Sequence, residues 1–381
     1  MFASSRRDFL RVAGVAAIAP YGLRHVRFGR GLLPFFVGTY TDGDSEGIYR
    51  CTFDTESGAL AVEGVTGLIE NPSYLAAHPS GGHLYAVSET SEFEGEPGGG
   101  VYAYSVDAQT NALSLLNAQR SHGGAPCYVT VTPDGGYVLV ANYSGGNFAM
   151  LPVQADGSLA PASDVAQHEG VGYNEERQPG PLGHCIIVGP TGRAYAVDKG
   201  LDRVVTYDLE GGELARTGSV DVIPGSGPRH MVFHPEGPFA YVINEIASSV
   251  SAFRYEEGAL FRTQTIATLP DDYEENNTTA DVHVSVDGRF LYGSNRGHDS
   301  IAVYAIDAES GFLTPVQHVK TGGSTPRNFA LDPTGRFLLA ANQRTGNIVV
   351  FTRDAETGML EEAGQTLSVP APVCLRFLRT A

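Results

Sequence analysis

Residues 227–245 read GPRHMVFHPEGPFAYVINE, and this stretch decides the fold because its pattern recurs along the chain. A small or proline-containing start leads into an alternating apolar run, a Pro-x-Gly or Asp-Gly turn follows, and a second apolar run ends the segment. Alternation with a period of two around such a turn predicts a β-hairpin. The pattern occurs in five further segments: NPSYLAAHPSGGHLYAVSE (71–89), APCYVTVTPDGGYVLVANY (125–143), LGHCIIVGPTGRAYAVDK (182–199), TADVHVSVDGRFLYGSNR (279–296) and TPRNFALDPTGRFLLAANQ (325–343).

A second marker, Gly or Asn followed two residues later by Leu, recurs independently of the hairpins. A third apolar run, such as residues 300–306, lies between each hairpin and the next marker, so each unit contains about four short strands. Repeated four-stranded units are typical of the blades of a β-propeller. The marker predicts seven units, with spacings of 53, 46, 55, 46, 53 and 47 residues between Gly58, Asn111, Gly157, Gly212, Gly258, Gly311 and Gly358.

The two ends of the chain complement each other. Residues 35–40 (FFVGTY) resemble the second strand of a unit, whereas residues 371–377 (APVCLRF) resemble a first strand with no second strand after it. Pairing them would complete the seventh blade and remove an exposed sheet edge. We therefore predict an all-β, seven-bladed propeller closed by its terminal strands. An open solenoid or two packed sandwiches is the alternative.

The composition indicates a globular protein with an acidic surface. The 381 residues are 42% hydrophobic and 18% charged, with a formal net charge of −18. Residues 1–34 carry +5 of this, which leaves −23 for residues 35–381. Such a surface repels nucleic acid and anionic lipid, so neither is an expected partner. An anionic substrate would require a local pocket of Arg or His.

The N-terminus has the features of an export signal. Arg6-Arg7 precedes a short apolar run over residues 12–19, which is typical of twin-arginine signals and too short to span a bilayer. We expect residues 1–34 to be a signal and linker, residues 35–381 to form the propeller, and the protein to be periplasmic or otherwise exported as a monomer without membrane insertion. A basic tail without a targeting role is the alternative.

The four cysteines show no Cys-x-x-Cys spacing, so neither a zinc ribbon nor a redox pair is predicted. Three of them fit small core positions. In an exported protein a disulfide between Cys51 and Cys374 is conceivable.

The repeat also predicts where a ligand would bind. In each antiparallel hairpin the first strand begins where the second one ends, so these positions from all blades gather at one mouth of the ring. Their residue types differ from blade to blade, as a binding site requires. The long polar insertions at residues 91–100, 167–181 and 270–277 fall on the same face. The second, HEGVGYNEERQPGPLGH (168–184), is a candidate rim or lid.

Several of these motifs resemble a known family. LGHC (182–185), GPRH (227–230) with VINE (242–245), ADVH (280–283) and SNRGHDS (294–300) are similar to the seven-bladed lactonases, the family of propeller-type bacterial 6-phosphogluconolactonases and fungal carboxymuconate-lactonizing enzymes. The resemblance covers about residues 35–381. LGHC departs from the His-rich segment of many members, and an export signal is unusual among them. The resemblance implies a catalytic group consisting of His184, Arg229, Glu245 and Arg296.

Hydrolysis of a ring ester needs a base for the attacking water and a cation where the carbonyl oxygen gains charge. Glu245 or His184 could be the base, and Arg229 with Arg296 could bind the oxyanion and a substrate carboxylate or phosphate. A structural Glu245–Arg229 ion pair and a core histidine at position 184 are the alternatives. Further substrate-binding candidates are His230, Asp281, His283, Asn295, Arg327 and Asn328.

We expect no metal and no cofactor, because no compact ligand motif is present and Gly-rich residues 95–100 precede no helix pattern. No Gly-x-Ser-x-Gly elbow supports a serine hydrolase. The sequence therefore favours a lactonase acting on a small sugar-acid lactone. A non-catalytic exported propeller that binds a ligand or protein, and a lactonizing isomerase, remain alternatives.

Overall fold

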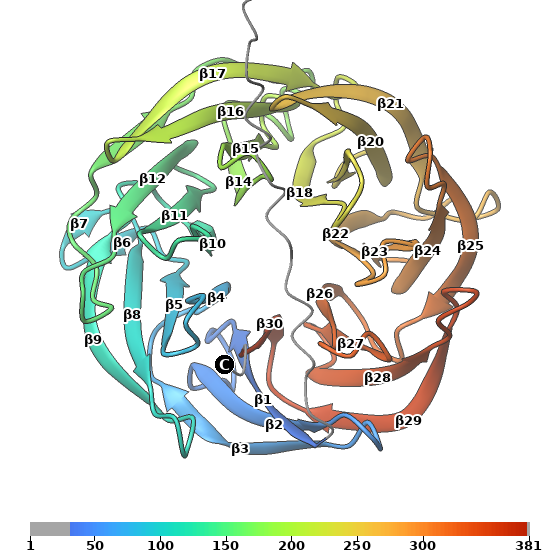
Figure 1. Cartoon of the computed structure of the whole chain (residues 1–381), viewed down its shortest axis with the longest axis horizontal. Helices are drawn as coiled ribbons and strands as arrows, with labels where there is room; N and C mark the ends of the chain where they lie inside the picture. Colours follow the sequence, from blue (N-terminus) through green and yellow to red (C-terminus); the bar gives the residue numbers. More distant parts are fainter. Residues whose placement is uncertain (1–30, 379–381) are drawn as a thin grey trace, which may run out of the picture.

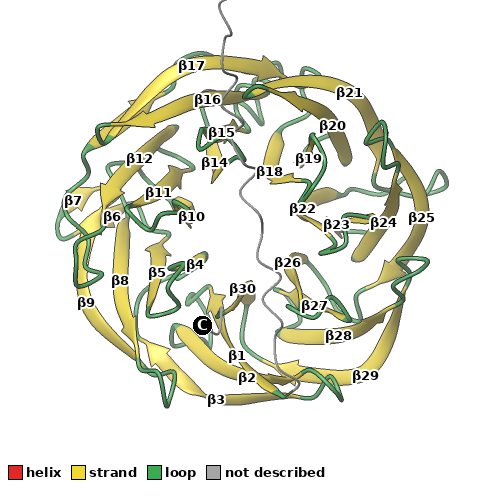
Figure 2. Ribbon diagram, in the orientation of Figure 1, coloured by secondary structure: helices red, strands yellow, loops and turns green. Residues whose placement is uncertain are grey.

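The computed structural model describes residues 31–378, which form thirty strands and no helix (Figure 2). Seven four-stranded sheets stand around a central axis as the blades of a ring (Figure 1), which confirms the predicted seven-bladed propeller. A two-stranded hairpin of β6 (Glu92–Phe93) and β7 (Glu96–Pro97) lies in the first insertion. The export signal expected in residues 1–30 lies outside the described residues. Within residues 31–378 no helix is long and apolar enough to cross a bilayer.

Each blade runs from an innermost to an outermost strand, in chain order except at the closure. The innermost strands are β4 (Leu75–Ala77), β10 (Pro126–Val131), β14 (Gly183–Val188), β18 (Pro228–Phe233), β22 (Thr278–Val284), β26 (Pro326–Leu331) and β30 (Pro372–Phe377). The second strands are β5 (His83–Ser88), β11 (Tyr137–Asn142), β15 (Ala194–Asp198), β19 (Phe239–Asn244), β23 (Phe290–Arg296), β27 (Phe337–Asn342) and β1 (Leu32–Thr39). The third strands are β8 (Gly100–Val106), β12 (Asn147–Pro152), β16 (Arg203–Glu210), β20 (Ser249–Glu256), β24 (Ser300–Ile306), β28 (Asn347–Arg353) and β2 (Ile48–Asp54). The outermost strands are β9 (Leu113–Arg120), β13 (Asp164–Gln167), β17 (Glu213–Asp221), β21 (Ala259–Ala267), β25 (Leu313–Lys320), β29 (Leu360–Ser368) and β3 (Leu60–Gly67).

The ring is closed as the sequence predicted. The seventh sheet has the order β3-β2-β1-β30, and antiparallel pairing sets Val37 opposite Leu375 and Gly38 opposite Cys374. β1 begins at Leu32 rather than at residue 35, so three residues assigned to the linker belong to the closing blade. Apolar side chains fill the space between blades. Phe53 and Phe337, for example, pack edge to face with ring centroids 5.4 Å apart.

The glycine marker has two structural roles. All seven marker residues lie in the turn between a third and an outermost strand and have positive φ, from 55° at Asn111 to 90° at Gly258, a conformation that favours Gly or Asn. Four marker carbonyls also accept a hydrogen bond from a tyrosine of the preceding blade. The donors are Tyr85 to Gly157 (3.0 Å), Tyr195 to Gly258 (2.8 Å), Tyr241 to Gly311 (3.0 Å) and Tyr292 to Gly358 (2.9 Å).

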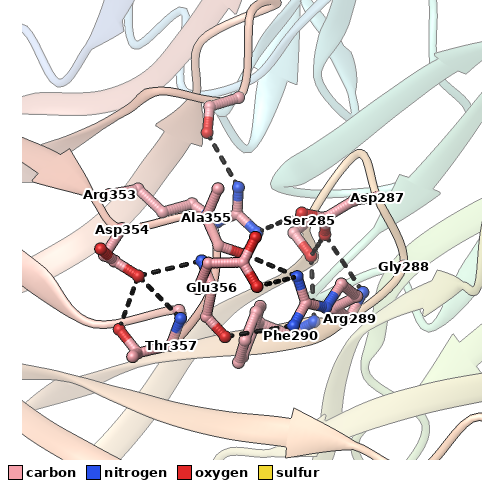
Figure 3. A network of polar contacts seen from close by, with 12 residues as sticks. Ser285, Asp287, Gly288, Arg289, Phe290, Arg353, Asp354, Ala355, Glu356 and Thr357 are labelled. Carbon is pink, nitrogen blue, oxygen red and sulfur yellow. Dashed lines mark hydrogen bonds and ion pairs between the residues drawn. The ribbon is translucent and has the colours of Figure 1, made fainter.

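Arginines add further bonds between neighbouring blades on this face. Arg289 donates to the carbonyls of Ala355 (3.0 Å) and Glu356 (3.2 Å), and Arg353 pairs with Asp287 at 2.6 Å (Figure 3). The turns of adjacent blades are therefore joined by polar contacts as well as by the apolar core.

The other end of the ring, where innermost strands begin and second strands end, is called the mouth below. The loops from second to third strands and from each outermost strand to the next blade lie here. All three long insertions belong to these two loop types, as the sequence predicted.

The four cysteines are buried and free, so the conceivable Cys51–Cys374 disulfide is not present. The two residues lie in β2 and β30, which flank β1 on opposite sides. Since a full strand separates them, their side chains serve as small core residues.

We predict that Tyr241→Phe lowers the free energy of unfolding by about 1 kcal/mol, because it leaves the buried Gly311 carbonyl without its donor. Tyr137→Phe is the control, since its hydroxyl makes no hydrogen bond within residues 31–378, and it should change stability by only a few tenths of this. Urea unfolding measures both. Equal effects would show that the interblade bond contributes nothing.

Candidate active site

The ends of three neighbouring hairpins bring four charged side chains together at the mouth. Glu245 directly follows β19, Lys199 directly follows β15, Arg296 ends β23 and Arg229 is the second residue of β18. The antiparallel pairing places these positions at the same end of each blade. Residues far apart in sequence thus form one cluster.

Glu245 is the centre of this cluster and only 7% exposed. Its Oε1 lies 2.7 Å from Lys199 Nζ and 3.5 Å from Arg177 Nη2, while its Oε2 lies 3.0 Å from Arg296 Nη2 and 3.2 Å from Arg229 Nε. Burial alone would raise the pKa of Glu245, but Arg296, Lys199 and Arg229 lower it more, and the net pKa is well below the ordinary value. Glu245 is therefore a carboxylate held by four cations.

Positive charge exceeds negative charge in the cluster around Glu245, although the whole chain is strongly acidic. Burial and the charge of Arg229 lower the pKa of Arg296 to about 9, so Arg296 is still protonated at neutral pH. Its side chain is 14% exposed, and its Nη1 makes no hydrogen bond within the described residues. Within residues 31–378, Arg177, Lys199, Arg229 and Arg296 all lie within 4.0 Å of the single carboxylate of Glu245.

Arg327 is positioned by an aromatic ring rather than by an acid. Its guanidinium lies 5.2 Å from the ring centroid of Tyr40, whose hydroxyl donates to Glu89 Oε2 at 2.9 Å. No carboxylate of residues 31–378 lies within 4.0 Å of the guanidinium. Burial lowers the pKa of Arg327, but Tyr40 and Glu89 raise it more. Its forked donors are thus charged and free to bind an anion.

His184 is a neutral base candidate beside the cluster. Burial lowers its pKa well below the ordinary value, and Arg229, His230 and Lys199 lower it further. Its Nδ1 lies 3.6 Å from Cys127 Sγ. Its Nε2 has no hydrogen-bond partner in the described chain and is not fully enclosed, so this nitrogen can accept a proton from water.

His230 orients Arg229 from the side that faces away from the mouth. Its Nδ1 lies 2.8 Å from Asp281 Oδ1, and its Nε2 lies 3.3 Å from Arg229 Nη1. Burial and Arg229 lower the pKa of His230 to about 4, so the ring is neutral, donates from Nδ1 to Asp281 and accepts from Arg229. Asp281 and His230 therefore hold Arg229 without adding a second positive charge.

The other substrate-binding candidates lie below the mouth. Asp281 is 2% exposed, and its carboxylate binds His230, His283 Nε2 (3.0 Å) and Asn328 Nδ2 (2.5 Å). These side chains lie next to the rings of Tyr74 and Tyr128, which stack 4.1 Å apart. We call this layer the plug, which consists of Tyr74, Tyr128, His230, Asp281 and Asn328.

Asn295, another substrate-binding candidate from the sequence, is engaged by the framework of the ring. It is fully buried, its Oδ1 accepts from Thr268 Oγ1 at 2.7 Å, and its Nδ2 donates to the Thr268 carbonyl at 2.8 Å. Asn142 and Asn342 make similar bonds at the corresponding positions of other blades. Asn295 thus holds a loop, as part of the repeated framework.

The lid candidate supplies a residue that sequence reasoning missed. Arg177 reaches Glu245 from the insertion between β13 and β14, and its side chain is 43% exposed. The fully buried Gln178 anchors this segment by donating to the Lys199 carbonyl at 2.8 Å. His168 anchors its start through Asp198 (2.7 Å). Lys199 was also missed, and a lysine at the end of a second strand in an acidic chain was the available signal.

Within residues 31–378 no group of three or more His, Cys, Asp or Glu side chains is arranged to hold a metal ion.

Comparison with known proteins agrees with this architecture. Residues 34–377 match the family described as "Lactonase, 7-bladed beta-propeller". The chain therefore belongs to this family of propeller lactonases. It is 43% identical over 346 residues to a 6-phosphogluconolactonase of Bacillus subtilis, covering 90% of this chain and 97% of that protein. A 6-phosphogluconolactonase of Formosa agariphila is 33% identical over 308 residues, covering 78% of this chain and 86% of that one.

Among solved structures, the periplasmic gluconolactonase PpgL of Pseudomonas aeruginosa superimposes with a TM-score of 0.84 and 34% identity. The match covers 92% of this chain and all of that one. The entire ring is thus shared with this structure.

We predict that Glu245→Gln lowers the free energy of unfolding by about 3–5 kcal/mol, because the buried cations lose their common counter-ion. The control is Glu256→Gln, which breaks an exposed ion pair with Arg254 and should cost at most about 1 kcal/mol. Chemical denaturation followed by circular dichroism compares them. A Glu245→Gln protein as stable as the control would mean that the cations do not depend on Glu245.

Proposed function

We propose that this protein hydrolyses the ring ester of an anionic sugar-acid lactone, with His184 as the base. The observation that carries the proposal is the excess of cations around a neutral histidine at the mouth of an acidic protein. Membership of the lactonase family and the similarity to 6-phosphogluconolactonases support it. The cations recognise a carboxylate or phosphate and stabilise the charge that develops on the carbonyl oxygen.

In this mechanism His184 Nε2 takes a proton from water as the water oxygen attacks the lactone carbonyl carbon. Arg296, with a free Nη1, stabilises the resulting oxyanion. The ester bond then breaks, the ring oxygen receives the proton from His184, and an open hydroxy acid is released. Arg327 and the lid residue Arg177 bind the distal anionic group of the substrate.

Glu245 suits a supporting role better than that of base. Both of its oxygens are engaged by cations, whereas Nε2 of His184 has no hydrogen-bond partner within residues 31–378. Its charge keeps Lys199, Arg229 and Arg296 close together despite their mutual repulsion. Arg229 is 2% exposed and bound to the Ala280 carbonyl, so it mainly maintains this arrangement.

We predict that His184→Asn lowers kcat/KM about 10²- to 10⁴-fold for 6-phosphogluconolactone or gluconolactone, whichever is the better substrate. Wild-type activity should be at its plateau at neutral pH and fall in acid only below pH 6.5, because the lowered pKa of His184 keeps the base unprotonated until then. Lactone turnover above the spontaneous rate measures both.

The control is His78→Asn, which lies on the opposite face of the ring and should retain activity. If His184→Asn were as active as His78→Asn, the assignment of the base would fail. If the wild type did not exceed the spontaneous rate with either lactone, lactonase activity on sugar acids would be excluded.

We also propose that the N-terminal segment directs export through the twin-arginine route. Arg6-Arg7 and the short apolar run support this, and one relative of similar structure is a periplasmic enzyme. We predict that replacing Arg6-Arg7 with Lys-Lys moves the protein from the exported to the cytoplasmic fraction, as seen by immunoblotting of fractionated cells. An unchanged distribution would contradict a twin-arginine signal. A variant with Arg24 replaced by Lys is the matched control.

A further inference from the structure

A cavity lies at the end of the ring opposite the mouth. It has a volume of about 340 Å³ and is lined by β4, β10 and β30, which lie side by side at the centre of the ring (Figure 1), and by the turns that follow β4 and β10. Its lining includes Ala76, Tyr128, Thr130, Pro133, Arg376 and Phe377. This volume is at the lower end of the range for small-molecule sites.

Arg376 gives this cavity its chemical character. The guanidinium donates from Nε to the Leu75 carbonyl at 3.0 Å and lies 5.8 Å from the ring centroid of Tyr74. Its two terminal nitrogens make no hydrogen bond within residues 31–378, and none of these residues places a carboxylate within 4.0 Å. A charged fork without a counter-ion therefore lines the cavity.

The nearest acid is not available to neutralise Arg376. Asp281 is already bound by His230, His283 and Asn328. Thr130, by contrast, adds a hydroxyl that has no hydrogen-bond partner within the described chain. The cavity thus offers two kinds of donor and no acid.

The framework does not require an arginine at this position. Arg376 pairs with Phe36 of the second strand, and the equivalent register position in the other blades holds mostly small or apolar residues. These residues are Ala76, Thr130, Ile187, Val232, His283 and Ala330. Six blades pack without an arginine here, so the repeat itself does not account for the two free terminal nitrogens of Arg376.

The plug separates this cavity from the mouth. The His230 ring lies 5.8 Å from that of Tyr74 and 5.2 Å from that of Tyr128, although these residues belong to different blades. The side chains of Tyr74, His230, Asp281 and Asn328 are buried between the two ends of the ring. A ligand at Arg376 would therefore not compete directly with the substrate.

We propose that this cavity is a second anion site, which binds a small organic carboxylate or phosphate through the fork of Arg376 and the hydroxyl of Thr130. The walls formed by Ala76, Pro133 and Phe377 suit a ligand with a short apolar portion. The site is independent of lactone hydrolysis at the mouth.

Calorimetric titration at low ionic strength tests this, with gluconate and inorganic phosphate as separate probes. Arg376→Gln should bind one anion fewer per chain than the wild type, or bind it at least tenfold more weakly, and keep kcat/KM within twofold. Arg262→Gln removes the same charge from the exposed outermost strand β21 and should bind like the wild type. Loss with gluconate alone identifies a carboxylate site, and loss with phosphate alone a phosphate site.

Identical binding by Arg376→Gln and Arg262→Gln with both probes would overturn the proposal. If Arg376→Gln does not fold, Arg376→Lys and Thr130→Val replace it, because they keep the charge or the shape. Each of these two substitutions should weaken anion binding several-fold. Unchanged affinity in both variants would also overturn the proposal. Lost lactonase activity in these variants with intact anion binding would likewise contradict the separation of the two sites.

Discussion

The antiparallel pairing of β1 with β30 is the constraint on which the rest of the structure depends. This pairing joins the first described strand to the last. The backbone hydrogen bond from Tyr40 N to the Ala371 carbonyl (3.2 Å) extends the pairing to the rim of the mouth. Tyr40 in turn supports Arg327 and binds Glu89, which come from the two neighbouring blades. Closure of the ring and placement of a substrate-binding arginine are therefore parts of one arrangement.

The interior of the ring has two polar layers with different electrostatics. At the mouth, four cations share the single buried carboxylate of Glu245, and the remaining positive charge can be neutralised by an incoming anion. In the plug, the carboxylate of Asp281 is bound by His230, His283 and Asn328, so this layer needs no ligand. His230 links the two because it accepts from Arg229 and donates to Asp281. The plug thus fixes the geometry of the mouth without adding to its charge.

Most of the fold was predictable because it repeats. Hairpin alternation and the positive-φ marker each recur often enough to reveal the blade, and the incomplete first and last segments indicate closure. Side-chain partners are harder to infer. Asn295 and Arg296 are adjacent, yet the first is saturated by Thr268 and the second reaches the mouth. The difference depends on how the preceding loop folds, which alternation does not encode. Arg177 was missed for the same reason, since an insertion has no counterpart in other blades.

The closing strands also have a mechanical consequence. Leu32 and Phe377 lie at the same end of the antiparallel pair, so both ends of the described chain leave the ring on the face opposite the mouth. Tension applied between these two points would load the hydrogen bonds of β1 and β30 one after another, as in a zipper, rather than all at once. The ring would then open between β1 and β30 while the other six blades remained intact. At the mouth, the contact of Arg327 with Tyr40 would be lost first.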